Sequence, residues 1–191
     1  MAATNSITTF LHGALACAVV YACGCAAESS ALDASTGDGP ARIDGGSSAS
    51  WTTHAPVPQA VQETAVVELD GIIYVLGGFD ANGTTLNRVS AYEVATNTWS
   101  SVAPMPLAVH HVNAAVVGGK IYVVGSLVAN FGSHGGVWEF DPSQNAWATL
   151  SDMPAGTERG SAAVGVIDGT IYLAGGFRSL ASVSDVSSYS P

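Results

Sequence analysis

The sequence predicts an all-β protein made of repeated four-stranded antiparallel units. Three tryptophans, Trp51, Trp99 and Trp147, are separated by 48 residues each time. A fixed period of this length is typical of a repeat architecture, in which each repeat forms one structural unit. Between the tryptophans, short segments rich in Val, Ile and Tyr alternate with glycine-containing turns, and no segment after residue 50 has helical periodicity. This pattern indicates a β-propeller.

The predicted strands follow the same order in each repeat. The first two strands of repeat 51–98 are separated by Asp70-Gly71, and those of repeat 99–146 by Gly118-Gly119. Such pairs supply the positive φ angles of a two-residue hairpin turn. The second strand ends in a glycine pair, the third carries an aromatic residue such as Tyr92, and the fourth begins at the next tryptophan.

The third repeat, 147–191, is looser but keeps the same parts. Its segment Ile171–Phe177 repeats Ile73–Phe79 almost residue for residue, and Asp168-Gly169 takes the place of the hairpin turn. Counting a strand at Trp51, the sequence predicts twelve strands, or about three blades. Closed propellers have four to eight blades, so the ring is expected to be incomplete.

The pattern resembles the kelch repeat. The matching features are the double glycine after the second strand and an aromatic pair with six residues between its members, as in Tyr92 and Trp99. The chain departs from the kelch pattern at Ser126, which replaces the second glycine, at Phe140, which replaces Tyr, and in lacking the last Trp. The resemblance covers residues 51–191 and implies a kelch-type β-propeller with one blade per repeat. We expect these aromatic and glycine residues to serve packing rather than catalysis.

The sequence leaves two explanations of the incomplete ring. The chain is either a fragment of a longer kelch protein, from a truncated reading frame, or one of two copies that associate to complete a six-bladed ring. In the second case each copy donates its first strand to the last blade of the other. Three isolated blades would expose two blade faces and an unpaired strand edge.

Residues 1–25 resemble a secretory signal segment, although no Lys or Arg precedes the apolar stretch. Ala22-Cys23-Gly24-Cys25 resembles a bacterial lipoprotein processing site, with Cys25 as the lipidated residue and Cys23 as the alternative. An ordinary signal segment without a lipid remains the other interpretation. We expect an exported protein, lipid-anchored in the cell envelope (outer membrane or periplasm) or secreted.

Residues 26–50 are dominated by Ala, Ser, Gly, Asp and Thr, which predicts a flexible tether. The formal net charge is −10 with only five Lys and Arg residues. Such a chain would be repelled by nucleic acid. We therefore expect no nucleic-acid partner, and contact with a membrane only through the N-terminal lipid.

Any ligand is expected on the face that carries the long connections, because binding groups gather on loops held by a rigid scaffold. His110 and His111 are the one pair that suggests a metal site, but neighbouring residues of a strand point to opposite faces, which argues against one shared ion. Glu158-Arg159 is expected to be a solvated loop pair. The candidate ligand residues on this face are Asp80, Asn82, Arg88, His110, His111, Asn130, His134, Arg159 and Arg178.

The function predicted from the sequence is a non-catalytic module that binds a protein or glycan. The region after residue 50 contains no cysteine and no Ser-His-Asp or paired-carboxylate pattern, so we expect no metal, cofactor or catalytic residues there. The missing cysteine excludes chemistry like that of galactose oxidase. The alternatives are a carbohydrate-active enzyme similar to a sialic-acid mutarotase and a non-functional truncated fragment.

Overall fold

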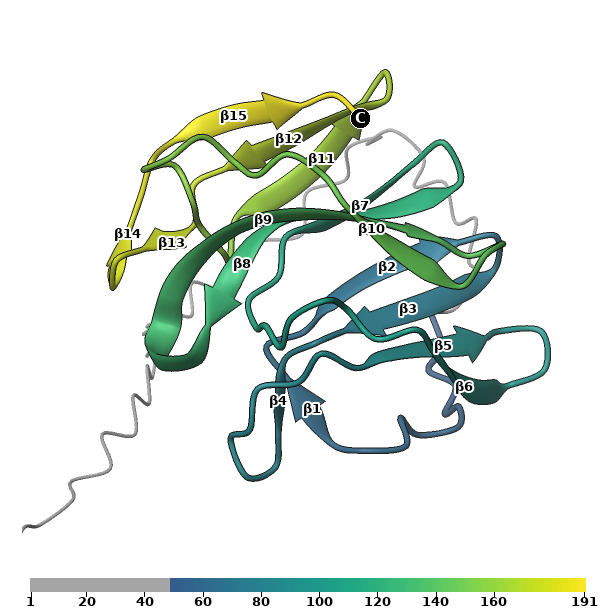
Figure 1. Ribbon diagram of the computed structural model, residues 1–191. Coiled ribbons are helices and arrows are strands. Elements are labelled where there is room, and N and C mark those ends of the chain that lie inside the picture. Colours follow the sequence, from purple (N-terminus) through teal and green to yellow (C-terminus); the bar gives the residue numbers. More distant parts are fainter. Residues whose placement is uncertain (1–48) are drawn as a thin grey trace, which may run out of the picture. The chain divides into compact units, whose positions relative to one another are not determined.

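Three larger antiparallel sheets follow one another along the chain, accompanied by two two-stranded ladders (Figure 1). The structure, a computed structural model, describes residues 49–191, so the signal segment, Cys23, Cys25 and most of the proposed tether lie outside the described residues. We call the sheets blade 1 (order β2-β3-β5-β6), blade 2 (order β7-β8-β9-β10) and blade 3 (order β11-β12-β15). The prediction of an all-β fold with consecutive antiparallel blades and no closed ring is confirmed.

The elements have the following bounds. Blade 1 and its ladder contain β1 Val61–Gln62, β2 Ala65–Leu69, β3 Ile72–Leu76, β4 Phe79–Asp80, β5 Val89–Glu93 and β6 Thr98–Val102. Blade 2 contains β7 Ala114–Val117, β8 Lys120–Val128, the 3-10 turn η1 Ala129–Phe131, β9 Gly132–Asp141 and β10 Ala146–Thr149. Blade 3 and its ladder contain β11 Ala163–Ile167, β12 Thr170–Ala174, β13 Phe177–Arg178, β14 Ala181–Ser182 and β15 Val186–Tyr189.

The tight hairpin turns form as the sequence predicts. Asp70 and Gly71 have φ angles of 53° and 78°, and Asp168 and Gly169 have 49° and 75°. Two consecutive positive φ angles define the type I′ turn, whose twist matches that of the strands it joins. These turns set the register of β2 with β3 and of β11 with β12.

The strand predicted at Trp51 is not formed. Trp51 lies outside any strand and its side chain is fully exposed. A strand needs a hydrogen-bonded neighbour, and no strand of residues 49–191 pairs with the residues around Trp51. The three blades therefore contain eleven strands rather than the predicted twelve, because the strand expected at Trp51 is missing and blade 3 has three strands, as predicted.

Each blade packs one face against the next blade. Tyr74 and Leu76 of blade 1 are buried in one core with Ile121 and Phe140 of blade 2, and the rings of Tyr74 and Phe140 meet edge-on at 6.0 Å. A second core joins blades 2 and 3. Its buried members are Ala115, Tyr122, Val124, Val137, Ile171 and Leu173. Burial of these apolar faces is the main force holding the blades together.

The repeated aromatic pairs serve packing, as expected. Tyr92 and Trp99 face each other across β5 and β6, with ring centroids 5.0 Å apart. The Trp99 indole donates a hydrogen bond of 2.9 Å to the carbonyl of Ala55, and Trp147 donates one of 2.9 Å to Ala103. Each indole therefore fastens the segment that leads into its own blade.

Candidate functional site

The inner ends of the three blades are tied together by backbone hydrogen bonds. The amide of His111 donates to the carbonyl of Glu63 at 2.9 Å, and the amide of Ser161 donates to the carbonyl of His111 at 2.8 Å. These residues precede the neighbouring inner strands β2, β7 and β11, and all three have a positive φ, of 55°, 51° and 58°. The repeat thus places Glu63, His111 and Ser161 at equivalent positions of the three blades. Backbone hydrogen bonds connect them in series at the end that carries the long loops.

His110 and His111 come together at this end of the blades, contrary to the sequence-based expectation. The rule that neighbours point to opposite faces holds for extended strands, whereas His111 adopts a φ of 51°. As a result the two Nδ1 atoms are 2.6 Å apart. His111 Nε2 lies 3.1 Å from Glu63 Oε2, and His110 Nε2 lies 2.9 Å from the carbonyl oxygen of Val128.

The hydrogen bonds that link Glu63, His111 and His110 indicate which ring nitrogens donate and which accept. The Val128 carbonyl can only accept, so His110 Nε2 carries a proton and, in the neutral ring, His110 Nδ1 accepts. His111 then donates from Nδ1 to His110 and from Nε2 to the Glu63 carboxylate. Burial lowers the pKa of His110, an effect that the Val128 carbonyl opposes. With a neutral His110, every ring nitrogen of the two histidines has a partner in this arrangement.

This histidine chain is suited to holding a proton rather than a metal ion. Both nitrogens of His110 and both of His111 are engaged in the contacts described. In residues 49–191 no group of three His, Cys, Asp or Glu side chains could hold an ion. The chemistry available here is proton exchange and hydrogen bonding.

An aromatic ring from blade 2 covers the histidines. Phe131 lies at the end of the β8–β9 hairpin, which extends toward the β1–β4 and β13–β14 ladders (Figure 1). Its ring centroid is 5.0 Å from that of His110 and 5.6 Å from that of His111. It also lies 6.4 Å from Phe79 and 6.4 Å from Phe177, which occupy equivalent places in β4 and β13. One hairpin therefore contacts residues from all three repeats.

The backbone that presents Phe131 is strained. Asn130 and Phe131 have φ angles of 59° and 58°, in the left-handed region. Asn tolerates this region, but a residue such as Phe pays about 1–2 kcal/mol there. The Phe131 side chain is nevertheless 42% exposed, so part of its apolar surface is open to a partner. Strained residues of this kind cluster at functional sites.

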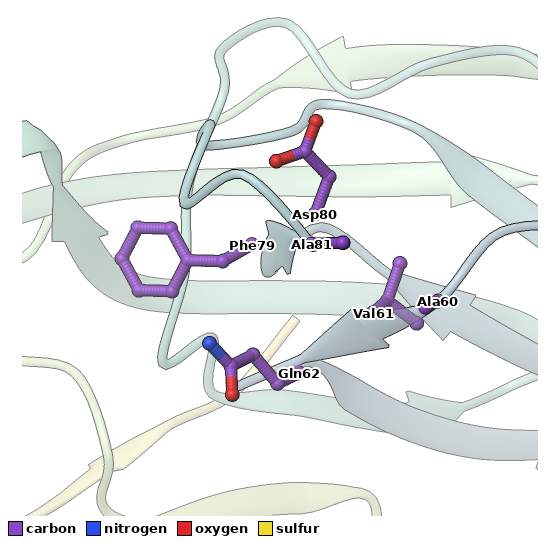
Figure 2. Close-up of a pocket in the computed structure, with 6 residues that line it drawn as sticks. All are labelled: Ala60, Val61, Gln62, Phe79, Asp80 and Ala81. Atoms are coloured by element: carbon purple, nitrogen blue, oxygen red, sulfur yellow. The ribbon is translucent and has the colours of Figure 1, made fainter.

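Two hollows flank the β1–β4 ladder. The larger, of about 510 Å³, is lined by Gln62, Phe79, Gly83, Thr85, Ala129, Asn130 and Phe131. The smaller, of about 220 Å³, is lined by Ala60, Val61, Gln62, Phe79, Asp80 and Ala81. Figure 2 shows the Phe79 and Gln62 side chains on the same side of the ladder and the Asp80 carboxylate directed away from them. Cross-strand pairing of Gln62 with Phe79 produces this arrangement.

Some of the predicted ligand residues gather around the larger hollow. Asn130 lines it, and His110 lies directly behind Phe79, with ring centroids 4.2 Å apart. Asp80 and Asn82 shape the neighbouring loop, because Asp80 Oδ1 accepts the amide hydrogens of Asn82 and Thr84. These hydrogen bonds, that of Thr84 first, lower the pKa of Asp80.

Two half-buried arginines of the prediction, Arg88 and Arg178, are held by partners. Arg88 donates to Gln59 Oε1 at 2.6 Å, and Arg178 forms an ion pair of 2.6 Å with Asp185. His134 lies apart, over Trp138, with ring centroids 5.5 Å apart. It lines a separate hollow of about 330 Å³ that also includes Asp152 and Glu158.

Arg159 is not the solvated loop residue that the sequence suggested. Its side chain is fully buried and donates hydrogen bonds to the carbonyls of Thr157, Leu173 and Gly175 and to the hydroxyl of Ser187. A buried guanidinium must have its donors satisfied. Arg159 therefore braces blade 3 internally and is unavailable to a ligand.

Sequence reasoning missed four residues of the site: Gln62, Glu63, Phe79 and Phe131. One signal could have found Glu63, because the 48-residue period aligns it with His111. Phe79 follows a glycine pair, as Phe177 does. Nothing in the local sequence indicates that Phe131 reaches all three repeats, because that contact depends on the length and curvature of the β8–β9 hairpin.

Consecutive antiparallel four-stranded blades, packed face to face and tied at their inner ends, define the class of β-propeller repeat proteins. Within this class, the chain belongs to the kelch-repeat family, since residues 45–191 match the KLHDC2/KLHL20/DRC7 Kelch-repeats domain. No curated protein was found with a significant sequence match. Within the described part of the chain, no helix is long and apolar enough to cross a membrane.

Proposed function

We propose that this kelch-repeat domain is a non-catalytic binding module and that its ligand is a segment of another protein. The observation that carries the proposal is Phe131, a large apolar side chain that stays exposed in a strained backbone conformation beside a hollow of about 510 Å³. Aromatic residues in such positions commonly dominate the binding energy of an interface.

The surroundings of Phe131 favour a peptide over a sugar. Leu180, at the tip of the β13–β14 hairpin, is 71% exposed and offers a second apolar contact on the same face. Gln62 and Asn130 line the hollow, and their side-chain amides make no hydrogen bond with other described residues. Amide groups of this kind can both donate to and accept from a peptide backbone. A peptide would match this surface, because its apolar side chains can pack on Phe131 and Leu180. Its backbone amides can then hydrogen-bond with Gln62 and Asn130.

The test is selection from a random peptide library, in parallel with a glycan array, on the full chain. We expect peptides with an apolar side chain to bind, and Phe131→Ala to weaken them at least tenfold. Val94→Ala is the matched control, because Val94 is an exposed apolar residue at the opposite end of blade 1. Binding to glycans alone, or peptide binding that is insensitive to Phe131→Ala, would overturn the proposal.

The second candidate function is an isomerase similar to a sialic-acid mutarotase. The observation in its favour is the Glu63–His111–His110 chain, whose groups can exchange protons beside the hollow. Its test is the rate of anomer exchange of a free sialic acid, measured by NMR. Acceleration that is lost in His111→Asn and Glu63→Gln would replace the binding proposal with this one.

We also propose that the chain is exported and held in the cell envelope by a lipid on Cys25, with Cys23 as the alternative. The support is the apolar segment that ends in Ala22-Cys23-Gly24-Cys25. Intact-mass measurement of the protein extracted from membranes tests this proposal. A diacylglyceryl mass that disappears in Cys25→Ser but persists in Cys23→Ser is the expected result. Detection of the full unprocessed chain would contradict it.

A further inference from the structure

Two blade faces are open, one on blade 3 and one on blade 1. Along β12, Ile171 and Leu173 are buried against blade 2, whereas Tyr172 between them points away and is 40% exposed. Val186, on the same outer face, is 72% exposed. On the outer face of blade 1, Val66 is 60% exposed. Contiguous apolar surface of this kind marks an interaction site.

The open face of blade 3 is equivalent to a face that is buried elsewhere in the chain. Tyr172 and Ala174 occupy the places of Tyr74 and Leu76 in blade 1, as the aligned hairpins show. Tyr74 and Leu76 are buried against blade 2. The outer face of blade 3 is therefore equivalent to the face of blade 1 that packs against the blade that follows it.

The open face of blade 1 is equivalent to the face of blade 2 that packs against blade 1. Ile73 and Val75 on this face correspond to Ile121 and Val123 of blade 2, which pack against blade 1. Ile73 and Val75 are only partly buried. The chain thus exposes both halves of an interface that it forms twice internally.

The segment around Trp51 provides an independent observation. In blade 2, Ala103 is fastened to Asn145 and Trp147, and the residues just before Ala103 form β6, the edge strand of the preceding blade. In blade 1, Ala55 is fastened in the same way to Asn97 and Trp99. The residues just before Ala55, including the fully exposed Trp51, are therefore positioned to be the edge strand of a blade that precedes blade 1.

Within residues 49–191, no strand pairs with the free edge of β15 in blade 3, where this segment could add one. Strand β15 pairs with β12 on one side only. Tyr189, in β15, occupies the place of Tyr92 and Phe140, each of which pairs with a tryptophan on the following strand. Tyr189 has no such partner in the described residues, and Trp51 has no such tyrosine.

We propose that a second copy of this chain docks head to tail on these faces. Blade 3 of each copy packs on blade 1 of the other, and residues 50–54 of each copy become the fourth strand of the partner's blade 3. Two copies of the three described blades make a ring of six, which lies within the four to eight blades of closed propellers. Closure also removes the open ends that would otherwise generate filaments.

The test is the molar mass of the full chain in solution, measured by light scattering after size-exclusion chromatography. We expect twice the chain mass of 19.2 kDa. A monomer over the whole micromolar range, or an open series of larger species, would overturn the proposal. Because Val186 is exposed, Val186→Lys should leave each chain folded and weaken the dimer at least tenfold. Leu107→Lys is the matched control, since Leu107 is an exposed apolar residue of a connecting loop outside both faces.

The tryptophan segment is tested separately by Trp51→Ala. We expect this variant to keep the circular dichroism spectrum of the parent and to dissociate at higher concentration than the parent does. In the parent, dilution below the dissociation constant should shift the tryptophan emission to longer wavelength as Trp51 returns to water. An emission that is independent of concentration in a dimeric parent would contradict the strand exchange.

Discussion

The two ends of the blades differ in the residues that adopt left-handed backbone. At the end with the tight turns, the four non-glycine residues with positive φ are Asp70, Asn97, Asn145 and Asp168. At the end with the long loops there are seven, namely Glu63, His111, Asn130, Phe131, Ser161, Ser179 and Leu180. Asp and Asn tolerate this conformation, whereas most other residues lose about 1–2 kcal/mol in it. Local sequence thus determines the tight turns, whereas tertiary contacts hold the residues at the long-loop end in left-handed conformations.

The largest difference between the two ends is expected for glycine substitutions. Gly125 and Gly71 have nearly the same φ, 77° and 78°, so the backbone strain of an alanine is equal. A Cβ at Gly125 would lie 2.6 Å from the Arg159 carbonyl oxygen and 2.6 Å from Met153 Sδ, whereas one at Gly71 meets nothing within 4 Å. We expect Gly125→Ala to lower the free energy of unfolding by about 3–5 kcal/mol and Gly71→Ala by about 1–2 kcal/mol. Urea titration measures the free energy of unfolding of both variants. Equal losses of stability would contradict the expected difference between the two ends.

Two asparagines give the next largest difference. Asn113 is buried, donates to the carbonyls of Val124 and Arg159, and accepts from the amide of Ala162. We expect Asn113→Ala to cost about 2–4 kcal/mol, because it leaves buried groups unpaired between blades 2 and 3. Asn145→Gly, at the turn end, keeps a residue that tolerates the positive φ of this position and removes the one exposed hydrogen bond that Asn145 accepts from the Ala103 amide, so it should cost about 1 kcal/mol. Thermal unfolding of the two variants should preserve this order.

The third difference is the pH dependence of stability at the loop end. Burial lowers the pKa of His110 below its ordinary value of 6.5. The unfolded chain therefore takes up a proton at a pH at which the folded chain does not, so the free energy of unfolding should fall as the pH drops from about 7 to 5. His111 and the Val128 carbonyl contact His110, and the Glu63 carboxylate, paired with His111, completes its electrostatic surroundings.

The matched variant for this titration is His110→Asn, which removes the group. We expect the slope of stability against pH between 7 and 5 to become smaller in this variant. Val94→Ala, at the opposite end of blade 1, removes no titrating group and should leave the slope unchanged. An unchanged slope in His110→Asn would show that the histidine chain does not couple protons to folding.

The smallest expected effect is a gain in stability. Ser179 and Leu180 form the two-residue β13–β14 turn with φ angles of 52° and 63°, although neither residue favours them. Replacing this pair with Asn-Gly should stabilise the protein by about 1 kcal/mol, because that sequence suits a type I′ turn. Asp168→Asn, in a turn that already ends in Gly169, should change stability little. No gain at the β13–β14 turn would mean that its backbone is not strained.

The features that sequence reasoning predicted correctly are those set by neighbouring residues. The hairpin turn at Asp70-Gly71 and the pairing of Tyr92 with Trp99 recur because the repeat carries them in fixed positions. The site was predicted less well. His110 and His111 were placed on opposite faces, since nothing in the local sequence reveals the positive φ of His111, which accompanies its backbone hydrogen bond to Glu63.

The sequence by itself determined the repeat, the blades, the tight turns and the aromatic pairs, because each depends on residue type at short range or on a regular period. Only the tertiary structure decided that Arg159 is buried and that Phe131 covers the histidines. It also showed Trp51 exposed and unpaired, where the sequence predicted a strand. The physical reason is that side-chain burial and strand pairing depend on neighbours from other blades, which lie far away in the sequence.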